Sequence, residues 1–223
     1  MKVFFVIDIK NGRVVAGKSG ERDKYLPITD FSTLVSSDDP LKVVSQIKPR
    51  FLYAADLDRI MGIGDNMKVL LALSSMTDEL IADCGFRSAE EVDKLPFTPV
   101  VGTETFDITQ ISRGCYVSLD FKEEFLDASG KFGSWREAVE YLNSFDLYGV
   151  IVLPIHFVGT MKTDFSLLQA VMEVSDNPVL LGGGISSMDD LYRLKEMGCE
   201  GVLVATAVHR KKIPLEVVRR GKI

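Results

Sequence analysis

Short runs of apolar residues recur along the chain, and each is followed by a turn signal and then by a stretch whose apolar residues fall at helical spacing. The runs are nearly continuous, which is typical of parallel strands covered by helices on one face and by a core on the other. We therefore predict eight strands, over residues 3–9, 51–57, 79–84, 99–102, 115–120, 148–155, 178–181 and 201–205.

Seven segments between these runs have the spacing of helices, over residues 40–47, 65–73, 88–95, 134–143, 164–173, 188–197 and 214–219. Ser88 and Glu91 have the spacing of a capping box, and Gly198 is placed as a helix stop. Residues 107–112 give little more than one helical turn. Eight strands alternating with helices predict an α/β fold, the (β/α)8 TIM barrel, with an open doubly wound sheet as the alternative.

The two halves of the chain resemble each other weakly. Ile7-Asp8-Ile9-Lys10 parallels Leu119-Asp120-Phe121-Lys122, the segment 83–88 parallels 182–187, and Val101-Gly102-Thr103 parallels Val204-Ala205-Thr206. Similarity at a fixed offset is the mark of a duplicated structural unit. We therefore expect a single barrel domain over 1–223, built from half-barrel repeats at about 1–112 and 113–223.

Composition narrows the classes of partner and compartment. Lys and Arg total 26 and Asp and Glu total 32, so the net charge is −6, which argues against a nucleic-acid-binding surface. Cys84, Cys115 and Cys199 fit neither a disulfide framework nor a metal site, and a reducing cytoplasm is the simplest location. The short apolar start is no signal peptide, and no run approaches the roughly 18 apolar residues of a membrane span.

One glycine-rich loop predicts a phosphate site. Gly182-Gly183-Gly184 follows the seventh strand, and Ala205 and Thr206 end the eighth. In a TIM barrel, the loops after these two strands form the usual phosphate site, because glycines let backbone N–H groups approach the oxygens. We predict that Gly183, Gly184, Ala205 and Thr206 bind phosphate, and tight turns without a ligand are the alternative.

Two carboxylates are the candidate catalytic groups. Asp8 and Asp120 end strands one and five, which stand opposite each other in an eight-stranded barrel, at the face where catalytic groups belong. Two carboxylates across one pocket can divide the acid and base roles if their environments separate their pKa values. Alternatively, each aspartate caps the turn that follows its strand.

Several stretches in this order resemble the histidine-biosynthesis (β/α)8 proteins, a ribulose-phosphate-binding type of barrel. The family comprises phosphoribosylformimino-aminoimidazole-carboxamide ribotide isomerase and its cyclase relative. The resemblance implies that Asp8 is the base and Asp120 the acid of an Amadori rearrangement that needs no metal and no cofactor. The stretches are Val6–Val15, Ala55-Asp56-Leu57, Gly85–Ser88, Val117–Asp120, Gly159-Thr160, Asp164–Leu167, Gly182–Ser186 and Gly201–Val204.

The sixth strand departs from the family. Where the family carries a Thr or Asp early in this strand, and an Asp immediately before Gly-Thr, this chain has Leu153 or Pro154, and Val158. His156 lies close by and could replace the lost hydrogen bond, or it could be a solvated surface residue. We keep His156 and Thr160 as candidate substrate-binding residues.

The first half also departs from the family, at its expected phosphate site. The resemblance places substrate-binding residues there, but two acids now stand where a dianion would bind, Asp83 and Glu104. Like charges about 4 Å apart repel by about 4 kcal/mol at the effective dielectric of a protein surface. The family-matched candidates are Gly85, Arg87, Gly102 and Thr103.

We therefore expect a substrate with one phosphate, held by the second half, and an amino or hydroxyl-rich end near Asp83, Glu104 and Arg87. A structural ion cluster with Arg87 or Arg59 is the alternative. Residues 17–39 are too long for a connecting turn, and such loops are usually functional. In the family this loop closes over substrate, so Lys18, Arg22 and Tyr25 are candidate contacts.

Together these features predict a cofactor-free, isomerase-like enzyme that acts on a phosphorylated sugar or aminosugar. Two alternatives stay open: a paralogue in a different, coenzyme pathway with a monophosphate substrate, and a non-catalytic binder of phosphate compounds. The expected partner is a phosphorylated small molecule, with no nucleic acid, membrane or glutaminase partner. The sequence does not indicate the oligomeric state.

Overall fold

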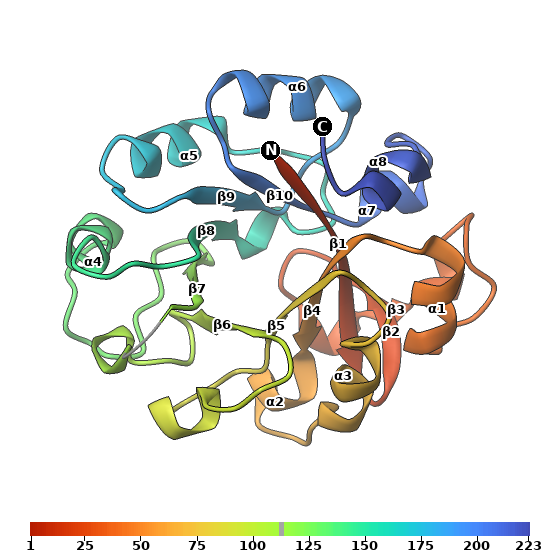
Figure 1. Cartoon of the computed structure of the whole chain (residues 1–223), viewed down its shortest axis with the longest axis horizontal. Coiled ribbons are helices and arrows are strands. Elements are labelled where there is room, and N and C mark those ends of the chain that lie inside the picture. Colours follow the sequence, from red (N-terminus) through yellow and green to blue (C-terminus); the bar gives the residue numbers. More distant parts are fainter. Residues whose placement is uncertain (112–113) are drawn as a thin grey trace.

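The apolar runs of the sequence form a closed barrel of eight parallel strands in the computed structural model, which describes residues 1–111 and 114–223 (Figure 1). Each barrel strand pairs in parallel with the next, and the last pairs with the first. This closure confirms the (β/α)8 barrel and excludes the open sheet. The barrel strands are β1 (Lys2–Lys10), β4 (Phe51–Asp56), β5 (Glu79–Asp83), β6 (Thr98–Gly102), β7 (Tyr116–Phe121), β8 (Gly149–Pro154), β9 (Val179–Gly182) and β10 (Gly201–Val204).

Helices surround the barrel, and Figure 1 shows them as an outer ring. The α-helices are α1 (Pro40–Ile47), α2 (Leu57–Met61), α3 (Met67–Leu73), α4 (Trp135–Leu142), α5 (Phe165–Met172), α6 (Met188–Glu196), α7 (Thr206–His209) and α8 (Leu215–Arg220). The 3-10 turns are η1 (Arg22–Lys24), η2 (Ile28–Asp30), η3 (Ala89–Val92), η4 (Ile108–Gln110) and η5 (Ile155–Phe157). Gly198 has a φ of +90° just beyond α6, as its prediction as a helix stop requires.

The helix predicted over 88–95 is wrong, because only the short turn η3 forms there. Lys94 adopts a φ of +59°, which no right-handed helix accommodates. The expected capping box is also absent: Ser88 makes no capping hydrogen bond, and Glu91 accepts one from the backbone N–H of Arg87 instead. The sequence therefore signalled the start of a helical turn but not its length.

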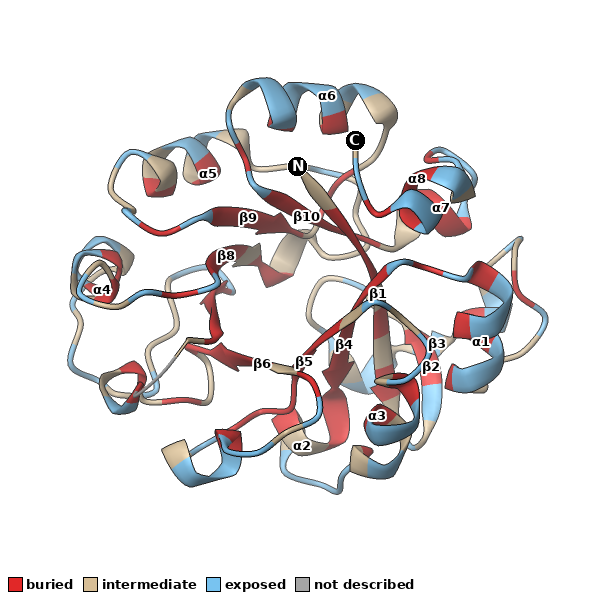
Figure 2. Cartoon of the chain, viewed as in Figure 1, coloured by how far each residue is buried: buried red, intermediate tan, exposed pale blue. Residues whose placement is uncertain are grey.

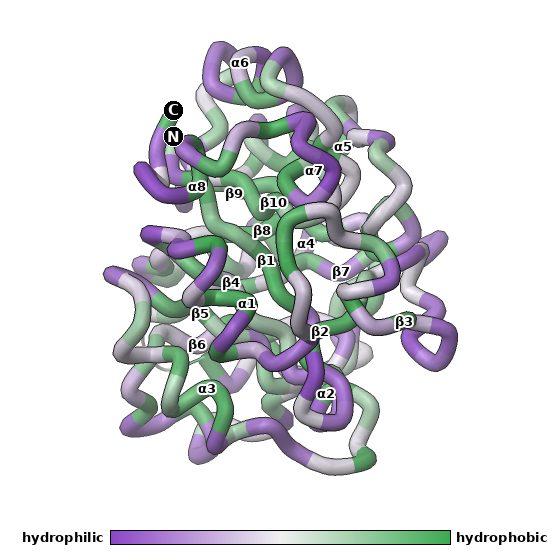
Figure 3. The backbone as a smooth tube through the Cα atoms, turned by 90° about the vertical axis from the view of Figure 1, so that its right-hand side faces the viewer, coloured by the Kyte–Doolittle hydropathy of each residue, from purple (hydrophilic) through white to green (hydrophobic). Residues whose placement is uncertain are grey.

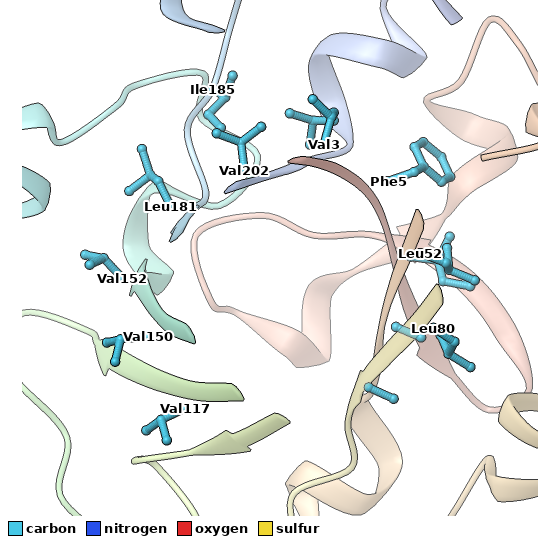
Figure 4. Packing of buried hydrophobic residues seen from close by; sticks show 14 of the residues in the cluster. Val3, Phe5, Leu52, Leu80, Val117, Val150, Val152, Leu181, Ile185 and Val202 are labelled. Atoms are coloured by element: carbon cyan, nitrogen blue, oxygen red, sulfur yellow. The ribbon is translucent and has the colours of Figure 1, made fainter. Parts of the chain in front are cut away.

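Side chains alternate along each strand between two apolar layers. In β1, Val3, Phe5 and Ile7 face the helices, whereas Phe4 faces the barrel interior. Figure 4 shows part of the outer layer, where Leu52, Leu80, Val117, Val150 and Leu181 project from neighbouring strands. Burial is continuous along the strands and confined to the inner sides of the helices (Figure 2), and the hydrophilic residues follow the loops and the outer helix surfaces (Figure 3). Because of this alternation, the carboxyl end of each strand has one inward-facing side chain that can reach the barrel mouth.

The long segment after β1 folds back over the barrel mouth. β2 (Arg13–Ala16) pairs antiparallel with β1, and β3 (Leu26–Pro27) extends the same ribbon. The expected junction of the half-barrel repeats, at residues 112–113, lies outside the described residues. Within the described ranges, no helix is long and apolar enough to cross a membrane.

Candidate active site

A cavity lies at the carboxyl ends of the barrel strands, where side chains from both halves of the chain meet. Asp8, Asp83, Glu104 and Asp120 bring four carboxylates to its wall, and Gly183, Gly184, Ala205 and Thr206 lie on it as well. The described part of its wall thus combines the predicted catalytic pair with the predicted phosphate loops. The ribbon after β1 contributes Val14, Val15, Ala16, Gly17, Arg22 and Tyr25.

Strand register explains why Asp8 and Asp83 come together. Asp8 of β1 is in register with Ala55 of β4, and Ala55 is in register with Asp83 of β5. All three positions face inward, so the two carboxylates lie in one row with only the small Ala55 side chain between them. One layer deeper, Tyr53 of β4 also points into the barrel.

Asp120 is held by hydrogen bonds to both carboxylate oxygens. Its Oδ1 accepts from the hydroxyl of Ser118 at 2.7 Å, and its Oδ2 accepts from the backbone N–H of Glu104 at 3.0 Å. The backbone N–H of Asp120 donates to the hydroxyl of Thr103 at 2.9 Å. Asp120 is 3% exposed, so this carboxylate is a fixed group at the edge of the cavity.

Gly102 provides the space that this arrangement needs. A Cβ at this glycine would stand 2.7 Å from Oδ2 of Asp120 and 3.4 Å from Oδ2 of Asp83. These two oxygens are therefore no more than about 6 Å apart, a range in which like charges raise each other's pKa.

Burial raises the pKa values of three cavity carboxyls. Burial and then repulsion from Asp83 raise the pKa of Asp120 to about 7, although its hydrogen bonds oppose the rise. Burial raises the pKa of Asp8 to about 6, with Arg22 opposing, and it raises the pKa of Asp83 to about 6, opposed by the Gly85 N–H and by Arg22. Near neutral pH, Asp8 is thus mainly a base and Asp120 is readily protonated, and the three groups titrate together.

Arg22 is the cation on the described wall of the cavity. Its guanidinium makes two hydrogen bonds to the Glu104 carboxylate, at 2.9 and 2.5 Å, across the mouth of the barrel. The predicted alternative, an ion cluster of Asp83 and Glu104 with Arg87 or Arg59, is replaced by this pair, and Arg59 bonds with Glu91 instead. Burial lowers the pKa of the other basic group on the wall, His209, to about 4, so this histidine is neutral at pH 7.

The predicted phosphate loops present free backbone donors. Gly183 and Gly184 have φ values of +85° and +79°, and a Cβ at Gly184 would overlap the carbonyl of Lys162. Among the described residues, neither glycine N–H has a hydrogen-bond acceptor. Thr206 is the first residue of α7, and the first N–H groups of a helix make no hydrogen bonds within it. Unpaired N–H donors on the wall of one cavity are suited to an anion.

The ribbon after β1 closes the cavity against the loop after β8. The backbone N–H of Ser19 donates to the carbonyl of Val158 at 2.8 Å, and a Cβ at Gly159 would collide with the carbonyl of Gly17. Arg22 and Tyr25 line the cavity as predicted candidates, whereas Lys18 is absent from its described wall. Leu153 of β8 and Val158, which follows β8, give this side of the cavity an apolar surface.

All six predicted substrate-binding residues, Gly102 among them, lie outside the described cavity wall. Arg87 is exposed, and its guanidinium binds the carbonyls of Arg59, Ile60 and Gly85 at the end of α2. The backbone N–H of Gly85 bonds to Asp83, Thr103 holds Asp120 in place, and the Thr160 hydroxyl donates to the carbonyl of Phe157. The His156 ring packs against Phe157 at a tilt of 53°, and its buried Nδ1 has no hydrogen-bond partner among the described residues.

Sequence reasoning missed Tyr53 and Ser118. Tyr53 falls within the apolar run of the second predicted strand, where nothing distinguishes it from a core residue, and Ser118 precedes Asp120 by two residues. The period of two along a strand places Ser118 on the same face as Asp120, which is a signal that could have identified it.

Comparison with known proteins relates the whole barrel to one family. A family model described as histidine biosynthesis protein matches residues 2–214. An uncharacterized protein of Methanocaldococcus jannaschii is 34% identical over 230 residues, covering 98% of this chain and 97% of that protein. Two proteins named 1-(5-phosphoribosyl)-5-((5-phosphoribosylamino)methylideneamino)imidazole-4-carboxamide isomerase are each 27% identical. The one from Methanopyrus kandleri matches over 93% of this chain and 92% of its own, and the one from Methanosphaera stadtmanae over 97% of both.

Proposed function

Because the chain belongs to the histidine biosynthesis protein family, we propose that it is a cofactor-free, isomerase-like enzyme acting on a phosphorylated sugar or aminosugar. The observation that carries this proposal is the pair Asp8 and Asp120, which line one cavity with pKa values near neutrality. The names of two relatives support an isomerase. Carboxyl groups tuned in this way can exchange protons with a substrate at neutral pH.

In the proposed reaction, protonated Asp120 donates its proton to the ring oxygen of an aminoaldose. The bond between C1 and this oxygen breaks, and the nitrogen lone pair forms an iminium ion at C1. Ionised Asp8 removes the proton from C2, which gives an enolamine. The aminoketose forms when the C2 hydroxyl loses a proton and C1 gains one, so the reaction is an isomerisation with no net loss of atoms.

The phosphate of the substrate is proposed to lie at Gly183, Gly184, Ala205 and Thr206. The free N–H groups of the two glycines and the start of α7 support this position. Phosphate held at a fixed point aligns the sugar carbons between the two carboxylates, because orientation lowers the entropic cost of reaction.

A paralogue with a substrate other than the histidine-pathway ribotide is the second candidate. Leu153 and Val158 offer an apolar surface where the family carries polar groups, and the Arg22–Glu104 pair occupies the other half of the mouth. These features favour a monophosphate substrate. Turnover of the histidine-pathway ribotide at the rate of its aminoaldose monophosphate analogues would argue against this candidate.

Substitution of the two aspartates tests the proposed chemistry. The assay follows exchange of the C2 hydrogen with solvent deuterium, using the histidine-pathway ribotide and a set of aminoaldose monophosphates as substrates. Asp8→Asn is expected to abolish exchange while phosphate binding persists, and Asp78→Asn, an exposed partner of Arg50 at the opposite face, is the control. Exchange that continues in Asp8→Asn would remove Asp8 from the base role.

A further inference from the structure

The charges around the cavity are unbalanced in one half. Arg22 is committed to Glu104, and both side chains are less than one third exposed, so this pair is internally neutralised. The remaining three carboxyls, Asp8, Asp83 and Asp120, form no ion pair among the described residues that line the cavity, and Arg22 acts on Asp8 and Asp83 only through space. An anionic substrate group would be repelled from this region, and a cationic group would be attracted to it.

Asp83 has an oxygen that the protein leaves free. Oδ1 accepts a hydrogen bond from the N–H of Gly85 at 2.9 Å, whereas Oδ2 has no donor among the described residues and faces the point above Gly102, near Oδ2 of Asp120. The side chain is 7% exposed and lines the cavity. Oδ2 is not sealed from solvent but opens to the cavity, so a donor on a ligand can reach it and form a charge-assisted hydrogen bond.

Tyr53 provides an independent sign of a ligand. Its side chain is 4% exposed, points into the barrel from β4 and reaches the cavity, yet its hydroxyl has no hydrogen-bond partner in the described part of the chain. Asp8, Asp83 and Asp120 lie close enough for their charges to act on it. Tyrosine hydroxyls of buried side chains usually have a hydrogen-bond partner. The Tyr53 hydroxyl opens to the cavity, so a ligand there can supply one.

The two half-barrels differ at the corresponding positions. Asp83 parallels Gly182, and Glu104 parallels Ala207. The second half thus offers backbone donors to an anion, while the first half offers carboxylates at the same level of the barrel. The described His, Cys, Asp and Glu side chains form no group of three or more that could hold a metal ion, so an organic cation fits these oxygens better.

We propose that Asp83, with Asp8, Asp120 and Tyr53, forms a binding site for a protonated amino group of the substrate, opposite the phosphate site. This inference rests on the proposed function and narrows the substrate class to an amine-bearing monophosphate. The ammonium donates to Oδ2 of Asp83, and the Tyr53 hydroxyl either donates to a neighbouring carboxylate or accepts from the ammonium. A second phosphate, as in a bisphosphate substrate, is excluded from this half.

The test uses probes that differ only at the end opposite the phosphate. The dissociation constants of a series of ω-aminoalkyl phosphates of increasing chain length are measured by calorimetry, together with matched alkyl phosphates and α,ω-bisphosphates. The best aminoalkyl phosphate is expected to bind about tenfold or more tightly than its alkyl partner, equivalent to about 1.4 kcal/mol. In Asp83→Asn this preference falls to about twofold, while the alkyl phosphate binds as before.

Proton release gives a second readout that a merely structural role for Asp83 would not change. A bound ammonium favours the ionised form of Asp83, whose pKa is about 6. Its binding near pH 6 therefore releases protons, which are detected by calorimetry in buffers of different ionisation enthalpy. Tyr53→Phe should weaken the aminoalkyl phosphate and spare the alkyl phosphate. Asp78→Asn is the matched control, and thermal unfolding verifies that each variant is folded.

Three results would overturn the inference. The first is a bisphosphate that binds as tightly as the aminoalkyl phosphate, the second is a preference that survives Asp83→Asn, and the third is a series in which no probe binds. If the amine preference is absent while Asp8→Asn still abolishes C2 hydrogen exchange, the amine site fails and the proposed chemistry stands. If the amine preference is present but C2 hydrogen exchange persists in Asp8→Asn, the amine site stands and the proposed chemistry fails.

Discussion

The carboxyl group of Asp120 is expected to destabilise the fold at neutral pH, and Asp120→Asn should remove that cost. The substitution is close to isosteric and preserves the local hydrogen bonds. The amide oxygen can accept from the Glu104 N–H, and the Ser118 hydroxyl can rotate to accept from the amide nitrogen, so the two contacts at 3.0 and 2.7 Å are retained. The main change is therefore the loss of a buried ionisable group.

The magnitude follows from proton linkage. Folding raises the pKa of Asp120 from 3.8 to about 7, so between these values the folded state holds a proton that the unfolded state has released. The free energy of unfolding therefore falls as pH rises from about 4 to about 7, and the full loss is present above pH 7. The loss is about 1.4 kcal/mol for each unit of difference between the folded and unfolded pKa values. Because Asp83 shares the effect, we expect Asp120→Asn to gain about 2–4 kcal/mol at pH 8 and close to nothing at pH 4.

Urea denaturation at a series of pH values measures this gain. Trp135, the one tryptophan of the chain, reports unfolding by fluorescence. Asp78→Asn, which removes an exposed carboxylate, should show no such growth with pH. If the difference in unfolding free energy between Asp120→Asn and the unsubstituted protein is the same at pH 4 and pH 8, the raised pKa is refuted, and with it the reason for assigning Asp120 the acid role.

Two further predictions concern the shape of the site. Gly102→Ala puts a methyl group 2.7 Å from Oδ2 of Asp120, so turnover should fall by about 10²-fold, as it does when a catalytic group is displaced by about 1 Å. Gly64→Ala, whose Cβ would meet its nearest atom at 3.6 Å, is the control. An unaffected turnover in Gly102→Ala would contradict the geometry. In a double-mutant cycle of unfolding free energies, Arg22→Gln and Glu104→Gln should show a coupling of about 1–2 kcal/mol, because both side chains are mostly buried. Additive effects would mean that this ion pair does not hold the segment after β1 against the barrel mouth.

The barrel strands could be predicted because burial on both faces leaves a continuous apolar run. The eight predicted runs agree with the observed strands to within one or two residues at each end. The ribbon after β1 could not be predicted in the same way: β3 contains only two residues, and the segment that holds it carries no repeating pattern. Short helices such as α2 were also missed, because Asp56 caps a helix whose first residue, Leu57, was assigned to the preceding strand.

The position of Asp8 and Asp120 could be predicted because strand ends in a closed barrel meet at one face. Their surroundings could not, because they depend on contacts between residues distant in sequence. Arg22 and Glu104 are 82 positions apart, and no local pattern indicates that they pair. The contacts of Arg87 could not be predicted either: the resemblance implies a substrate contact, and the guanidinium donates to carbonyl groups at the end of α2.

The two halves of the barrel present different groups at corresponding positions of one mouth. Equivalent loops of the two halves reach the same level on opposite sides of the cavity, so replacement of a glycine by an acid in one half leaves the other half intact. Gly182 keeps its side of the mouth free of charge near the donors of Gly183 and Gly184, and Asp83 adds a carboxylate on the other side. The Arg22–Glu104 pair neutralises one acid. Asp8, Asp83 and Asp120 form no ion pair among the described residues that line the cavity, and burial is the main cause of their raised pKa values. A substrate with a phosphate at one end and an amine at the other would place a cation beside these carboxyls and an anion beside the backbone donors of the other half.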